Sequence, residues 1–131
     1  MLIDANIFLE VLLGQKNAEK CRLFLGDIAS GKKQGILSTF SVDSIVLSML
    51  KNGVDKEEVK LFLNNLLKYK GMQFYQPKIR DRINCFSLIE IYGLDYEDAI
   101  VLQSAISSDS KEILSFDTDF NKVKEIKRIE P

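Results

Sequence analysis

Five aspartates lie at positions from which their carboxylates could take part in catalysis or metal binding. Asp4 closes the short apolar run at the start of the chain, and Asp117 and Asp119 follow the run EILSF. Asp43 and Asp98 lie near the beginnings of segments with helical apolar spacing. Clustered carboxylates raise one another's pKa values unless a cation balances them, and Mg²⁺ or Mn²⁺ prefers such oxygen ligands. Because these ions activate water and stabilise charge on phosphate, the pattern favours metal-dependent phosphodiester hydrolysis.

Each aspartate also has a structural interpretation, because Asp caps turns and helix starts. We expect Asp4 to be a ligand rather than a turn residue, and Asp43 to be a cap rather than a ligand. For Asp98 the alternative is an acidic residue that favours the positive end of a helix. For Asp119, capping and ligation both remain open.

Two residue types narrow the possible chemistry. The chain has no histidine, which excludes Ser-His-Asp and Cys-His catalysis and HExxH zinc sites. Cys21 and Cys85 are far apart in sequence and lie among apolar residues at helical spacing, so we expect buried thiols rather than a disulfide or a metal site. Any catalysis must therefore use carboxylates, hydroxyls, lysines and bound cations.

The composition is that of an ordinary globular protein. The 131 residues, of which 46% are hydrophobic and 28% charged, predict a single domain over 1–131. The net charge of −1 indicates neither a strongly basic nucleic-acid binder nor an acidic tail. The start of the chain does not resemble a secretory signal, and the least charged stretch, 35–50, is too polar to span a membrane. We expect a cytoplasmic protein.

Strand-like and helix-like segments alternate along the chain. The predicted strands are 1–6, 35–40, 71–76 and 111–116, with a last short one in 123–131. The predicted helices are 7–14, 17–31, 41–53, 55–71, 77–93 and 95–110, with Ser41 and Asp43 as caps of the third. This alternation predicts an α/β fold around a mainly parallel sheet, whose ligands bind at the carboxyl ends of the strands. All five aspartates could converge there.

The residues that carry this pattern also resemble a known family. LIDANIFLEVLL, YEDAIVLQSAISSDS and LSFDTDF resemble, in order and spacing, the PIN-domain ribonucleases, which include the toxins of VapBC-type toxin–antitoxin pairs. The resemblance extends over essentially the whole chain. It implies a Rossmann-like three-layer fold, an acidic pocket that holds Mg²⁺ or Mn²⁺, and endonucleolytic cleavage of RNA. It also implies a possible antitoxin partner and a homodimer.

The resemblance assigns roles residue by residue. Asp4, Asp98 and Asp117 match the catalytic and metal-binding acids, and Asp119 is an additional metal ligand. Asn6 and Ser115 match the polar neighbours of the first and last acids. If the chain forms a dimer, apolar residues of the first two helices could contribute, although burial in their own core is the expected fate of most of them: Phe8, Leu12, Phe24 and Ile28.

One position departs from the family. A glutamate normally follows the second strand, and our alignment places Ser44 there. Asp43 is its neighbour, but consecutive helical residues point about 100° apart, so Asp43 substitutes only after a local shift. Without that shift the site lacks one ligand.

Three functions are consistent with the sequence. The first is a metal-dependent endoribonuclease, and the second is a PIN-fold protein that has lost catalysis and binds RNA or protein. The third is a phosphatase of the haloacid-dehalogenase type. That type needs an Asp-x-Asp pair after the first strand, and DAN at 4–6 lacks the second Asp.

Overall fold

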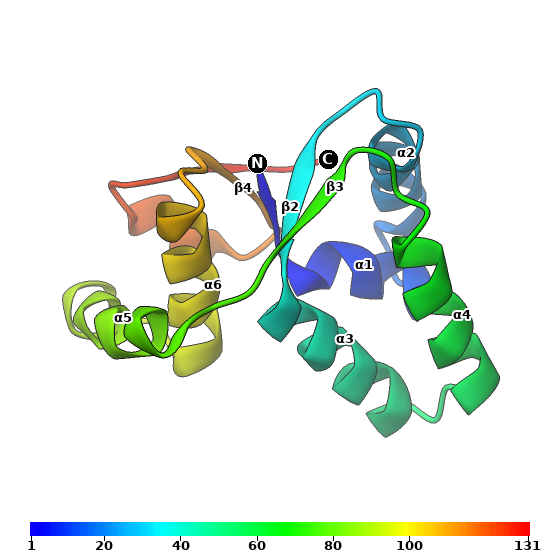
Figure 1. Cartoon of the computed structure of the whole chain (residues 1–131), viewed down its shortest axis with the longest axis horizontal. Coiled ribbons are helices and arrows are strands. Elements are labelled where there is room, and N and C mark those ends of the chain that lie inside the picture. Colours follow the sequence, from blue (N-terminus) through cyan, green and yellow to red (C-terminus); the bar gives the residue numbers. More distant parts are fainter.

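The computed structural model describes residues 1–131, and it confirms the predicted alternation of strands and helices. The elements, in chain order, are β1 (Leu2–Ile3), α1 (Ala5–Leu12), α2 (Ala18–Ala29), β2 (Gly35–Ser38), α3 (Thr39–Lys51), α4 (Lys56–Leu66), β3 (Met72–Tyr75), α5 (Ile79–Tyr92), α6 (Tyr96–Ser107), β4 (Glu112–Leu114), the 3₁₀ helix η1 (Thr118–Lys122) and β5 (Lys127–Ile129). Figure 1 shows these elements along the chain.

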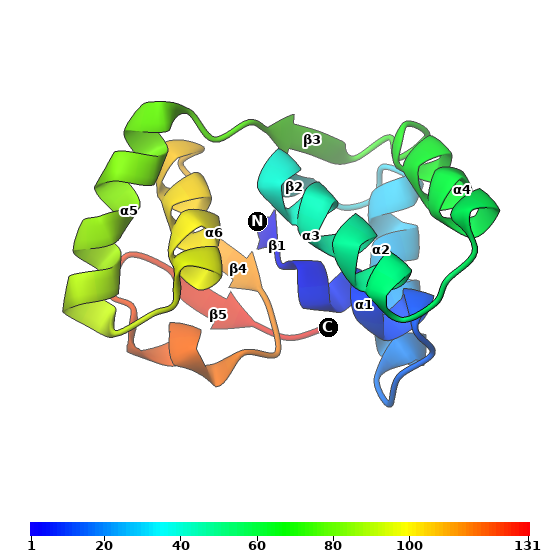
Figure 2. The ribbon, with the colours of Figure 1, turned by 90° about the horizontal axis from the view of Figure 1, so that it is seen from below.

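All five strands form one parallel sheet in the order β3-β2-β1-β4-β5. Figure 2 shows the strands side by side, with α1 to α4 on one side and α5 and α6 on the other. The chain builds outward from β1 to β3 in one direction, and β4 and β5 extend the sheet in the other. The strand order therefore reverses between β1 and β4, which are direct neighbours.

The sheet is buried on both faces, as a parallel sheet requires. Leu2 and Ile113 face a core shared with α5 and α6, whereas Ile3 and Leu114 face a core shared with α1 to α4. This alternation follows from the two-residue period of a strand. The three-layer α/β fold predicted from the sequence is confirmed.

Local sequence explains where α3 begins. The predicted second strand, 35–40, is two residues too long, because Thr39 and Phe40 already belong to the helix. The cap is Ser38, whose hydroxyl accepts a hydrogen bond from the Phe40 amide at 3.2 Å. The prediction that Ser41 and Asp43 are caps is therefore wrong, and Asp43 lies in the second helical turn.

Several smaller predictions are confirmed. Cys21 and Cys85 are buried free thiols, one in each core. Gly93 has a φ of 64° and ends α5 in the left-handed conformation that glycine adopts at low cost. None of the helices is both long and apolar enough to cross a membrane.

The four apolar residues considered for a dimer surface differ in how deeply they are buried. Phe8 and Ile28 are 2% and 0% exposed, so they belong to the core. Leu12 and Phe24 are partly buried and pack against that same core. Burial in the chain's own core, the fate expected of most of them, is confirmed for Phe8 and Ile28.

A buried carboxylate joins β3, α5 and α6. Asp81, in the first turn of α5, is 5% exposed and accepts hydrogen bonds from the hydroxyls of Tyr75 and Ser107, each at 2.6 Å. The backbone amide of Lys78 donates to the same side chain at 2.8 Å. Although burial opposes ionisation, these hydrogen bonds outweigh it and lower the pKa of Asp81. The network fixes the two helices of the α5–α6 pair to the sheet.

Candidate metal centre

The candidate site lies where β1 and β4 end, at the point where strand order reverses. Asp4 directly follows β1 and begins α1, with 8% of its surface exposed. Its backbone amide donates to the Leu114 carbonyl at 3.0 Å, which continues the pairing of the two strands. Asp4 is therefore fixed by the sheet itself.

The Ser115 hydroxyl connects the two strand ends. It donates to Asp4 Oδ2 at 2.6 Å and accepts from the Asp117 amide at 3.0 Å and from Asn6 Nδ2 at 3.2 Å. Ser115 is fully buried, so these partners replace water. Asn6 Oδ1 is also buried but has no hydrogen-bond partner, which leaves one oxygen beside the site unsatisfied.

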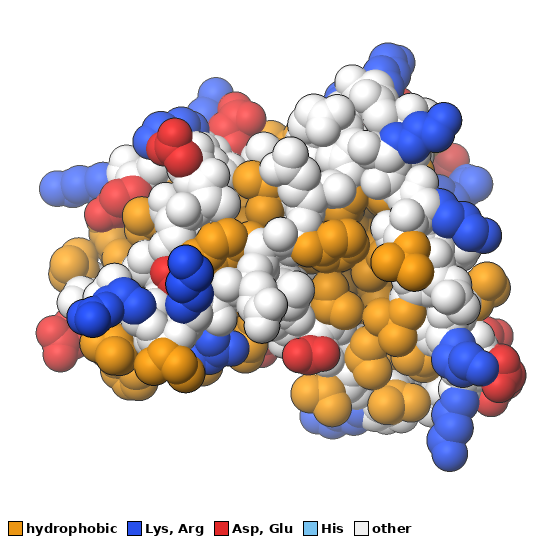
Figure 3. Space-filling view, in the orientation of Figure 1, with side chains coloured by type: hydrophobic (Ala, Val, Ile, Leu, Met, Phe, Trp, Pro, Cys, Tyr) orange, Lys and Arg blue, Asp and Glu red, His pale blue; other side chains and the backbone are white.

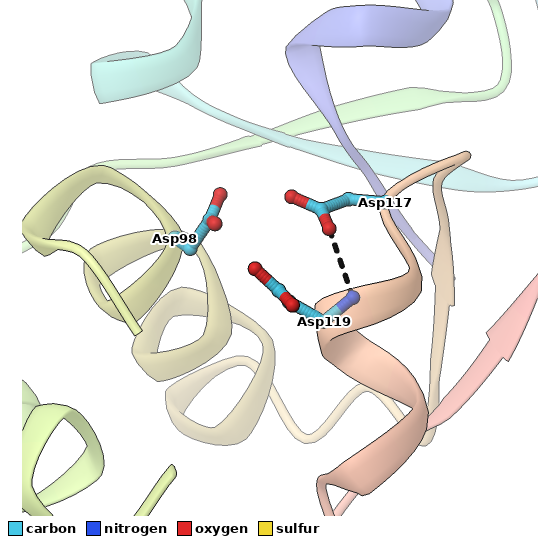
Figure 4. A group of neighbouring side chains, drawn as sticks. All are labelled: Asp98, Asp117 and Asp119. Carbon is cyan, nitrogen blue, oxygen red and sulfur yellow. Dashed lines mark hydrogen bonds between the residues drawn. The ribbon is translucent and has the colours of Figure 1, made fainter. Parts of the chain in front are cut away.

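Three further carboxylates come from α6 and from the segment after β4. Asp117 caps η1 by accepting a hydrogen bond from the Asp119 amide at 2.9 Å, and Asp119 lies in the first turn of η1. Asp98 lies in the first turn of α6. One oxygen of each of these three side chains lies within 4.8 Å of the others. Figure 4 shows the three side chains pointing toward one another.

Asp119 pairs with Lys122 at 4.0 Å, whereas Asp4, Asp98 and Asp117 form no ion pair within the chain. Burial is the main cause that raises the pKa of Asp4 to about 6, and the charge of Asp117 adds to it. Burial also leads the causes that raise the pKa of Asp98 to about 7, followed by the charges of Asp95, Asp117 and Asp4. Ser115 links Asp4 to the backbone of Asp117, and the charges of Asp4 and Asp117 both act on Asp98. Burial first, and neighbouring negative charge second, therefore disfavour the ionised forms of Asp4 and Asp98.

These residues fit a hard divalent cation. Every charged donor is a carboxylate oxygen, the ligand type that Mg²⁺ and Mn²⁺ prefer. A cation between the carboxylates would remove the repulsion that raises the pKa of Asp98. The unpaired Asn6 Oδ1 adds a neutral oxygen near the same place. Aspartates that follow strand ends in the sequence, namely Asp4, Asp117 and Asp119, therefore lie near one another in the structure.

Two sequence candidates on α3 contribute no charge to the cluster of carboxylates. Asp43 is exposed on α3 and lines a surface pocket of about 410 Å³ whose other walls are mostly apolar side chains from α3, α4 and β3: Val42, Leu63, Leu66, Leu67 and Phe74. Asp43 is therefore not among the acids that converge on the candidate site. Ser44 is half-buried on the same helix and carries no charge to offer.

Asp95, which caps α6, also affects the site, although it is not among the site residues predicted from the sequence. The Asp95 side chain accepts a hydrogen bond from the Asp98 amide at 2.8 Å, so Asp95 rather than Asp98 is the helix cap. Its charge also raises the pKa of Asp98. The signal that identifies Asp95 is the D-x-x-D spacing at the helix start, which is typical of a cap and its third helical residue.

Comparisons with known proteins agree with this geometry. The sequence model of the PIN domain matches residues 1–126. A sequence comparison with curated proteins gave no match.

Among solved structures, VapC20 of Mycobacterium tuberculosis, a toxin that cleaves the sarcin–ricin loop, superposes with a TM-score of 0.74 at 9% identity, over 96% of this chain and 98% of that chain. VapBC2 of Rickettsia felis, bound to a DNA fragment from its promoter, gives a TM-score of 0.73 at 13% identity, over 98% and 96% of the two chains. A toxin–antitoxin complex from Klebsiella pneumoniae superposes with a TM-score of 0.68 at 17% identity, over 95% of this chain and 93% of that chain.

The structural likeness supports the fold, and the sequence match over nearly the whole chain supports the family. The protein belongs to the PIN domain family.

Proposed function

We propose that this protein is a metal-dependent endoribonuclease in which Asp4, Asp98 and Asp117 are the catalytic carboxylates. The observation that supports the proposal is the convergence of acids from three distant segments. Asp98, Asp117 and Asp119 lie within 4.8 Å of one another beside the buried Asp4, at the edge of the sheet where ligands bind. Of these four acids only Asp119 has an ion-pair partner, Lys122, so the cluster is costly unless a cation balances it.

Asp98, Asp117 and Asp119 would hold Mg²⁺ or Mn²⁺, with Asp4 completing the charge around the ion. A bound ion of this kind activates water and stabilises negative charge on a phosphate. Ser115 would hold Asp4 in place through its hydrogen bond to Oδ2. A cation held here would favour the ionised form of Asp98, whose pKa of about 7 is raised by burial and by neighbouring carboxylates.

The substrate and partner follow from the proteins that this chain resembles. VapC20 cleaves an RNA loop, and several structural neighbours are toxins in complex with antitoxins. We therefore propose RNA as the substrate, an antitoxin as the protein partner and the cytoplasm as the location. A homodimer stays a prediction, and a monomer in light scattering at high micromolar concentration would contradict it.

A cleavage assay tests the proposal directly. Purified protein is incubated with single-stranded and structured RNA in the presence of Mg²⁺, Mn²⁺ or EDTA. We expect cleavage with at least one of the two ions and none with EDTA. Cleavage that persists in EDTA would contradict metal dependence, and intact RNA under all conditions would contradict the nuclease function.

A second function is favoured by Ser44. If a glutamate normally stands at this position, the pocket has about one negative charge fewer and binds a divalent cation more weakly. The protein would then be a PIN-fold module that binds RNA or protein without cutting it. A serine hydroxyl can orient water but cannot neutralise an ion.

Restoring the carboxylate distinguishes the two functions. We expect Ser44→Glu to bind Mn²⁺ about tenfold more tightly and to cleave RNA faster, because the fourth acid adds charge to the pocket. Isothermal titration with Mn²⁺ and initial cleavage rates measure the two effects. Ser48→Glu is the matched control, since it lies one turn further along α3 and is also half-buried.

Other outcomes have distinct meanings. If Asp43→Asn abolishes cleavage and Ser44→Glu is inert, Asp43 is the ligand and the alignment is wrong by one residue. If wild type binds no divalent ion and neither variant changes anything, the protein is a binding module.

A further inference from the structure

We propose that Phe40, Phe86 and Tyr96 form an aromatic ledge beside the carboxylates, on which an unpaired base of single-stranded RNA stacks. This inference rests on the proposed function, because it supposes that RNA is the ligand. It adds a base-binding subsite to a pocket that otherwise offers contacts only to phosphate.

The ledge is built by three elements of the fold. Tyr96 is the first residue of α6, Phe40 the second of α3, and Phe86 lies in the middle of α5. The Tyr96 ring meets the Phe40 ring edge-on, with centroids 6.1 Å apart, and the Phe86 ring at 5.9 Å with an angle of 46°. Each ring is therefore held by another, while 56% of Phe86 and 38% of Tyr96 remain exposed.

The ledge and the candidate metal centre share the start of α6. Tyr96 lies two residues before Asp98 in the first turn of α6, where its ring turns to another side of the helix, and Phe40 is the second residue of the helix that follows the carboxyl end of β2. The same helix start therefore presents a carboxylate and an aromatic ring. A nucleotide whose phosphate is bound near Asp98 would bring its base or its neighbour's base to the rings.

Cations beside the ledge match the charge of an RNA backbone. Lys78, Arg80 and Arg82 lie at the start of α5, and Arg82 is one turn before Phe86. None of the three forms an ion pair within the chain. Figure 3 shows Lys, Arg and hydrophobic side chains gathered over α5. In a protein with a net charge of −1 and an acidic pocket, RNA needs such local positive charge.

The combination favours a nucleic acid as the occupant. Proteins that bind single strands join a positive surface to aromatic rings, since every base has a face that stacks. A partner protein would use the exposed apolar residues of α5, namely Ile79 and Ile83, but would not need the positive charge at the start of α5, where Arg82 also donates to the Pro77 carbonyl. A second copy of this chain would bring equal positive charge to the same place.

Fluorescence tests stacking directly, because the chain has no tryptophan. Tyr96→Trp keeps an aromatic ring in the ledge and introduces the sole reporter. We expect single-stranded oligoadenylate, added in EDTA to prevent cleavage, to quench this fluorescence. An abasic oligomer of the same length, with phosphates but no bases, should not. Tyr69→Trp is the control, since Tyr69 packs against Phe8 on the other side of the sheet.

Kinetics test the ledge in the working enzyme. Tyr96→Leu and Phe86→Leu keep apolar volume but lose the ring, so we expect KM for single-stranded RNA to rise about tenfold, with kcat almost unchanged. Tyr96→Phe keeps the ring and should restore the wild-type KM. The rise in melting temperature caused by Mn²⁺ should be the same in all three variants, which shows that the metal centre is intact.

The outcomes separate the ledge from the nuclease. If wild type cleaves RNA and Tyr96→Leu and Phe86→Leu keep its KM, the ledge is wrong and the proposed function stands. If no RNA is cleaved but oligoadenylate still quenches Tyr96→Trp selectively, the proposed function fails and the ledge stands. Equal quenching by the abasic oligomer overturns the ledge. So does a wild-type dimer that Phe86→Leu dissociates without any change in RNA affinity.

Discussion

Asp117→Asn is expected to reduce RNA cleavage about 100-fold or more, with little change in the fold. Asp117 faces Asp98 and Asp119 within 4.8 Å, and its charge acts on Asp4, so it lies at the centre of the cluster. An amide removes one negative charge and one strong ligand from the ion, whose contribution to hydrolysis is several kcal/mol. The η1 cap survives, because the asparagine oxygen can still accept from the Asp119 amide.

Initial rates with Mn²⁺ measure this effect, and circular dichroism checks the fold. Asp43→Asn is the matched control, since it makes the same substitution at an exposed position outside the cluster. We expect its rate to be within about twofold of wild type, as for a surface substitution. An Asp117→Asn variant that cleaves as fast as Asp43→Asn would remove Asp117 from the catalytic residues.

Without metal, the protein is expected to become less stable as the pH rises from about 4 to about 7. The folded-state pKa of Asp4 is about 6 and that of Asp98 about 7, both above the ordinary value of 3.8. In this window the folded chain holds more protons than the unfolded chain. The free energy of unfolding therefore falls as protons leave, and the stabilisation is complete only below the unfolded pKa.

Asp4→Asn tests the main part of this effect. Since the variant has no charge to bury, we expect it to be about 2 kcal/mol more stable than wild type near pH 8 in EDTA, and close to wild type near pH 4. Urea unfolding at the two pH values measures the difference. Saturating Mn²⁺ should stabilise wild type at the higher pH and stabilise the variant less. Equal responses of both proteins to Mn²⁺ would show that Asp4 is not a ligand.

The sequence predicts the fold well because its signals are local. Apolar periods, glycines at helix ends and aspartates after strands each depend on a few neighbouring residues, and the strands and helices appear where these signals place them. The position of Asp4 beside Asp117 also follows, since parallel strands present their carboxyl ends at one edge. The family resemblance and the general rule for parallel sheets both predict that Asp4 and Asp117 lie at the same edge of the sheet.

Contacts between distant residues are what the sequence could not show. Asp43 lies in the second turn of α3 rather than at its start, because Ser38 and not Ser41 caps the helix, and that cap position depends on where β2 ends in the sheet. The sequence places Asp81 in a first helical turn, where an acid is common, but it does not show that the hydroxyls of Tyr75 and Ser107 hydrogen-bond to this buried side chain. The pairing of Phe40 with Tyr96 likewise depends on the packing of two helices that have no common sequence signal.

The central position of β1 has a consequence for how the protein folds. Only two residues long, β1 pairs with β2 on one side and with β4, which begins at Glu112, on the other. During synthesis, β1 cannot pair with β4 until more than a hundred later residues have been added to the chain. Such long-range pairing closes large loops and slows folding. A ribosome-bound chain that ends before β4 also lacks Asp117, so the candidate metal centre cannot form until β4 and the segment after it have been synthesised.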